Sequence, residues 1–103
     1  MQAELDLAAS MTVRTAAQFR SEMISAFASH SEVVLNLAAV ADVDLSFVQT
    51  VYAARDHADR NGKAFRLAEP TSGAVLALLE RGGFVLEASP ADCDFWFHGE
   101  MPR

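Results

Sequence analysis

The order of segments along the chain constrains its fold more than any other feature, because short strand-like runs alternate with helical stretches. The clearest run is VVLNL at residues 33–37, which is almost continuously apolar and typical of a central strand covered on both faces. Residues 2–7 alternate between apolar and polar side chains, as a strand with one solvent-facing side does. Further strands are predicted at residues 11–13, 64–68 and 84–87.

Two helices are marked by the same N-terminal pattern, in which a hydroxyl residue is followed three positions later by glutamine. Thr15 and Gln18 predict that the first helix covers residues 16–28. Ser46 and Gln49 predict that Ser46 caps the second helix. Apolar residues recur at helical spacing in both segments, so each helix is expected to bury one face.

The second helix is expected to reach about residue 60, where Asn61-Gly62 supplies a left-handed stop. A third helix is predicted from residues 70–72 to Gly82-Gly83. Helices between consecutive strands require crossover connections, which favour a parallel sheet. We therefore predict one α/β domain over residues 1–103, with a mixed, mostly parallel central sheet of four to five strands and helices packed on it.

The C-terminal tail, residues 88–103, is dense in aromatic side chains. The alternation of Phe95 and Phe97 predicts an extra edge strand at residues 94–98. The alternative interpretation is a segment that docks on a partner protein.

Net charge and cysteine content exclude several partners. The formal net charge is -6 and the eight lysine and arginine residues form no basic stripe, so neither nucleic acid nor an anionic membrane surface is expected to bind. No apolar run approaches the roughly 18 residues of a membrane-spanning helix, and no leader segment is recognisable. Cys93 is the only cysteine, which fits a reducing compartment. We expect a cytoplasmic protein without membrane insertion.

Candidate catalytic and metal-binding residues form no recognisable pattern. His30, His57 and His98 are far apart in the sequence, without HExxH spacing and without a G-x-S-x-G nucleophile turn. We therefore expect no enzyme activity, no metal and no cofactor. Asp42 and Asp44 alternate in one loop and have two interpretations: a paired-carboxylate site, or acidic residues favoured before a helix by its dipole.

Residues 33–84, which begin VVLNLAAVADVDLSFVQTVYAARDHADRNGKAF, resemble the body of a STAS domain, the module of sulphate transporters and anti-sigma antagonists. Residues 5–27 fit the opening strands and helix of that family. The resemblance implies a non-catalytic protein-interaction module. The phrases SFVQTVYAARDHADRNGKAFRLAEPTS and MTVRTAAQF are similar to stand-alone STAS domains of bacterial chemotaxis clusters. That similarity implies a kinase-like or receptor-associated signalling partner, with a homodimer as a further option.

Three positions depart from the family pattern. Leu45 stands where sporulation-type antagonists carry the phosphorylated Ser or Thr, Phe47 replaces a glycine, and neutral Asn36 replaces the Asp at the strand end. Leucine has no hydroxyl to carry phosphate, so the family's phospho-switch cannot operate at Leu45. Ser46 is the nearest substitute phosphosite, although a helix cap is the simpler role for this residue because it needs only the side-chain oxygen.

The family motif implies a partner-binding surface formed by six residues: Asp44, Leu45, Ser46, Phe47, Gln49 and Thr50. The Phe47 ring has two possible orientations, inward into the core or outward as an apolar anchor. Two alternative functions stay open. One is an accessory STAS subunit of an ABC-type lipid transporter ATPase, and the other is a nucleotide-binding sensor, which the glycine-poor loop disfavours.

Overall fold

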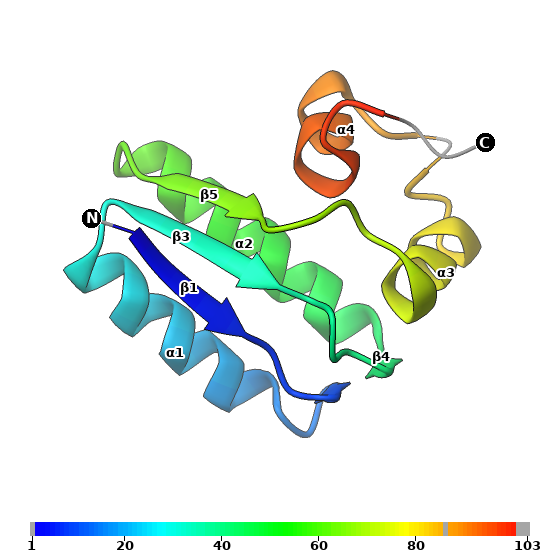
Figure 1. Cartoon of the computed structure of the whole chain (residues 1–103), viewed down its shortest axis with the longest axis horizontal. Coiled ribbons are helices and arrows are strands. Elements are labelled where there is room, and N and C mark those ends of the chain that lie inside the picture. The colour runs from blue at the N-terminus through cyan, green and yellow to red at the C-terminus, as the bar shows by residue number, and fades with distance from the viewer. Residues whose placement is uncertain (1, 86, 101–103) are drawn as a thin grey trace.

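A computed structural model describes residues 2–85 and 87–100 of the chain. Over these residues it contains β1 (Gln2–Asp6), β2 (Ser10–Met11), α1 (Ala16–Ser29), β3 (Glu32–Asn36), β4 (Asp42–Val43), α2 (Leu45–Arg60), β5 (Ala64–Leu67), α3 (Gly73–Arg81) and α4 (Pro90–Phe97) (Figure 1). No helix in this part of the chain combines the length and apolar character needed to cross a bilayer.

The main sheet has the strand order β1-β3-β5, and both of its pairings are parallel. Helix α1 connects β1 to β3 and helix α2 connects β3 to β5, as crossover connections require (Figure 1). A second, two-stranded sheet pairs β2 with β4, also in parallel. The predicted α/β class is confirmed, and its strands are divided between these two sheets.

Register places one apolar row across the three main strands. Leu5, Leu35 and Leu67 lie side by side in that row. The row packs in the core with α1 and α2, where the Phe19 and Phe47 rings stack with their centroids 5.6 Å apart. The prediction of a central strand at residues 33–37 is confirmed for β3, since its three middle residues are buried.

The first helix begins at Ala16 as predicted, but its predicted capping box does not form. Thr15 accepts a hydrogen bond from Thr12 N at 3.1 Å and makes no side-chain cap to the helix. Gln18 reaches forward to Glu22 instead of back to the cap. The Thr15 hydroxyl, which the sequence pattern predicted as the helix cap, therefore binds within the tight turn before the helix.

The strand predicted at residues 84–87 is wrong for the residues that the structure describes. Phe84, Val85 and Glu87 lie in turns, and Leu86 lies outside the described residues. The Phe84 amide donates to Leu79 O at 2.9 Å, and its ring stacks on Tyr52. The chain therefore folds back over the end of α3 and does not extend along the sheet.

The edge strand predicted at residues 94–98 is also wrong, because α4 occupies this segment. Ser89 and Asp92 form a reciprocal capping box, and Pro90 takes the first helical turn. The aromatic residues at 95–97 are all buried because the short helix packs on several neighbours. Because α4 is buried on more than one side, its apolar residues do not recur at helical spacing. The alternation of Phe95 and Phe97 therefore suggested a strand where the chain forms a helix.

Candidate functional site

The start of α2 is held against the loop that precedes α1. Strands β2 and β4 pair with the register Ser10 to Asp42 and Met11 to Val43, which brings these two loops together at one end of the molecule (Figure 1). The sequence predicted an extended piece at residues 11–13 and only a loop before α2. Two-residue strands are too short to produce a periodic signal, so their pairing was not predictable.

Asp44 is the residue that caps α2, which corrects the prediction that Ser46 does so. The Asp44 backbone is extended, and its Oδ1 accepts from Ser46 N at 2.9 Å. The Ser46 hydroxyl also donates to Asp44 Oδ1. Aspartate is among the best N-cap residues, so Asp44 takes the cap and the helix begins at Leu45, before the position of Ser46.

The second oxygen of the same carboxylate reaches the neighbouring loop. Asp44 Oδ2 accepts from Val13 N at 2.9 Å, so one side chain joins the loop before α1 to the start of α2. The hydrogen bond from the Ser46 side chain, followed by that from Val13 N, holds the pKa of Asp44 below its ordinary value of 3.8. Asp44 is therefore ionised at neutral pH and acts as a bridging acceptor.

The side chains on either side of Ser46 differ in exposure. Leu45 is 49 % exposed, whereas Phe47 is only 2 % exposed and belongs to the core. Phe47 is thus removed from the predicted contact surface, and the inward alternative is correct. Val13, which the sequence did not single out, is 70 % exposed and joined to Asp44 through its backbone amide.

These residues define what we call the α2-start surface: Val13, Asp44, Leu45, Ser46 and Gln49. Two exposed apolar side chains therefore flank a fixed carboxylate. A single exposed apolar side chain needs no explanation, whereas apolar side chains gathered in one patch mark interaction sites. The pairing of two of them at a rigid, capped helix start makes this the best-supported candidate site among the described residues.

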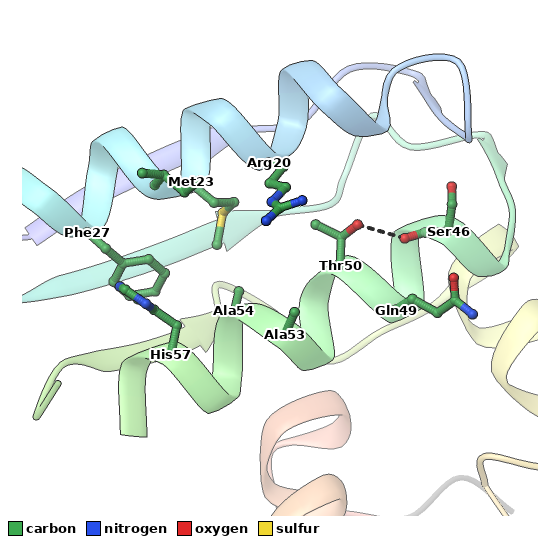
Figure 2. A pocket seen from close by; sticks show the side chains of 10 residues that line it. Arg20, Met23, Phe27, Ser46, Gln49, Thr50, Ala53, Ala54 and His57 are labelled. Carbon is green, nitrogen blue, oxygen red and sulfur yellow. Dashed lines mark hydrogen bonds between the residues drawn. The ribbon is translucent and has the colours of Figure 1, made fainter. Parts of the chain in front are cut away.

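A cleft of about 470 Å³ extends from this surface between α1 and α2 (Figure 2). Ser46, Gln49 and Thr50 line one end of it, so the structure brings three predicted site residues together. Thr50 Oγ1 donates to Ser46 O at 2.8 Å, and Arg20 points across the cleft toward Thr50 (Figure 2). Sequence reasoning missed Arg20, because nothing in the order of residues shows which face of α1 borders α2.

The remaining length of the cleft is shaped by small and apolar residues. Ala53 and Ala54 of α2 face Met23 and Phe27 of α1. The exposed Ile24 also contributes to the wall. An amphipathic cleft of this kind suits a protein side chain or helix more than a polar metabolite.

The three histidines take part in local packing. His30 Nδ1 lies 3.2 Å from Ala26 O, His57 packs on the Phe27 ring, and His98 Nε2 lies 2.9 Å from Leu67 O. Within residues 2–85 and 87–100, no group of three or more His, Cys, Asp or Glu side chains is arranged to hold a metal ion.

Comparison with known proteins adds one finding. The family model described as "Mlab, STAS domain" matches residues 2–85, from β1 to the turn after α3. The match includes the whole α2-start surface and leaves α4 outside. No curated protein matches the chain.

Proposed function

Because the chain belongs to the STAS domain family, we propose that it is a non-catalytic interaction module that binds a protein partner through the α2-start surface. STAS domains are generally non-enzymatic and commonly bind protein partners. The observation that carries the proposal is the presence of two exposed apolar side chains, Val13 and Leu45, beside a helix start that Asp44 fixes in place.

Contact through this surface is constitutive or controlled by the partner. An apolar side chain buried against another surface contributes about 25 cal/mol per Å² of apolar area. Ser46 is a poor alternative phosphosite, because a phosphate on its hydroxyl would lie against the Asp44 carboxylate, and like charges repel. The same carboxylate already accepts the Ser46 amide, which weakens the case for a nucleotide phosphate at this helix end.

Two classes of partner are compatible with this surface. The first is a kinase-like or receptor-associated signalling protein, which the resemblance of residues 46–72 to stand-alone STAS domains of chemotaxis clusters implies. The alternative is the ATPase of an ABC-type lipid transporter, to which this chain would be an accessory subunit. Leu45 supports the alternative in particular, because a permanent subunit needs no phosphorylatable residue at its contact.

A capture experiment distinguishes these classes. The purified chain and its Leu45→Asp variant are immobilised and exposed to host extract, and retained proteins are identified by mass spectrometry. We expect a partner that the parent retains and the variant loses. Ala91→Asp is the matched control, since it adds the same charge at an exposed position of α4. Retention of the same proteins by all three would contradict the proposed surface, and the identity of the partner separates signalling from transport.

A further inference from the structure

Strand β1 has an open edge. Among residues 2–85 and 87–100, β1 pairs in the main sheet only with β3, and it lies at the margin of the sheet (Figure 1). Leu7 N donates to Asn36 O at 3.0 Å, and backbone groups alternate in direction along a strand. The N–H and C=O groups of Asp6 and Glu4 therefore point away from β3, toward the open edge. Such a row of backbone groups is a template for pairing with another strand.

A groove of about 530 Å³ follows this edge, with α1 as its second wall. Ala3 and Leu5 of β1 line one side. Ser21, Ser25 and Ser29 lie four residues apart on α1 and line the other side with small side chains. A strand added beside β1 would direct every second side chain into this groove, as in complexes in which a peptide binds between a sheet edge and a helix.

The charges beside the edge are acidic. Glu4 and Asp6 are exposed on the β1 face that points away from the helices, and Glu22 lines the groove. None of the residues that line the groove is lysine or arginine. Opposite charges on neighbouring strands stabilise their pairing. The side chains of an added strand that lie on the same face of the sheet as Glu4 and Asp6 are therefore expected to be basic.

We propose that the β1 edge and its groove bind an extended, basic segment of a protein partner as an additional strand of the sheet. Backbone hydrogen bonds to Glu4 and Asp6 supply the pairing. Valine-sized apolar side chains fill the groove, and lysine or arginine side chains face the acidic residues of β1. This surface is separate from the α2-start surface and does not depend on the function proposed for it.

A second copy of the chain is a poorer occupant of the edge. Antiparallel pairing of two β1 strands about a two-fold axis at Glu4 places Glu4 opposite Glu4. An axis at Leu5 places Glu4 opposite Asp6 instead. Like charges directly opposite each other destabilise a strand pair, so both registers are disfavoured. The charge pattern thus selects a basic partner segment over self-association.

Selection of short random peptides displayed on phage, with the purified full chain as the target, tests this proposal. We expect enriched peptides in which apolar and basic residues alternate. Amide hydrogen exchange gives the most specific readout, because peptide binding should slow exchange at the Glu4 and Asp6 amides by about tenfold or more. Exchange at the Val13 and Ser46 amides, which both donate to Asp44, should be unaffected.

Variants show whether the enriched peptides use the edge and the groove. Glu4→Pro removes an outward-facing N–H, and Ser25→Phe fills the groove from an exposed helix position. Each should weaken peptide binding at least about tenfold. Ala17→Phe adds the same ring to α1 at an exposed position that does not line the groove. The ring control should bind like the parent.

Three results would overturn the proposal. The first is that no peptide is enriched, and the second is that enriched peptides bind Ser25→Phe as tightly as the parent. The third is that the chain forms a dimer that Glu4→Pro dissociates, which would make a second copy the occupant. Ser25→Phe keeps the test decisive if Glu4→Pro does not fold, because Ser25 is exposed and outside the core.

Discussion

Replacement of Phe47 by alanine tests the division between core and surface at the start of α2. The ring is 2 % exposed and stacks on Phe19. Truncation of a buried phenylalanine to alanine costs about 3–5 kcal/mol, because the transfer free energy is lost and a cavity remains. A domain of ordinary stability has only about 5–15 kcal/mol in total, so the variant should lie close to its folding limit.

Urea unfolding followed by far-UV circular dichroism measures the effect. With an m-value of about 2 kcal/mol/M, the midpoint should fall by about 1.5–2.5 M. Leu45→Ala is the matched control, since this adjacent side chain is 49 % exposed, and its free energy of unfolding should change by less than about 1 kcal/mol. Equal losses in the two variants, or a loss below about 1 kcal/mol for Phe47→Ala, would refute the assignment of Phe47 to the core.

Three further predictions follow from single contacts. The pKa of Asp44 is lowered in the folded protein, so its ionised carboxylate stabilises the fold above the ordinary pKa of 3.8, and this effect is lost as the pH falls through the pKa of the folded state. The difference in free energy of unfolding between the parent and Asp44→Asn, measured by urea titration, should therefore shrink only below about pH 4. Arg55→Met removes the 2.8 Å ion pair with Asp92, and chemical denaturation should show a loss of about 1–2 kcal/mol, with faster amide exchange in α4; unchanged exchange would contradict the role of this pair in holding α4. Gly82→Ala would place a methyl group 2.6 Å from the Phe84 ring, so thermal unfolding should show destabilisation despite the higher helix propensity of alanine; a stabilised variant would show that the ring moves freely.

The parts of the fold that depend on periodicity were predictable. Strand β3 is buried on both faces, so a continuous apolar run marks it in the sequence. The bodies of α1 and α2 bury one face each, so their apolar residues recur at helical spacing. Helix α4 was not predicted, although Ser89, Pro90 and Asp92 carry a capping signal. The buried aromatics after this signal suggested a strand, because a short helix enclosed on several sides has no polar face.

The candidate site was predictable in its location and less so in its details. The motif at Asp44 marked the loop, but both Asp44 and Ser46 are suitable caps, and only the backbone geometry shows that the helix begins at Leu45. The orientation of Phe47 depends on Phe19, a partner far away in the sequence. Val13 joins the site through a backbone hydrogen bond, which no side-chain pattern records.

The central claim is that a protein partner binds the exposed Leu45 side chain at the start of α2. Isothermal titration calorimetry at fixed salt, in which the recovered partner is titrated into the parent chain and into Leu45→Asp, tests it most directly. The quantity compared is the dissociation constant of each chain for the partner. The variant should fold and unfold like the parent, because Leu45 lies outside the core. A buried apolar contact replaced by a charge should weaken the affinity by about tenfold or more. An unchanged dissociation constant for Leu45→Asp would contradict the claim and would place the interface elsewhere on the domain.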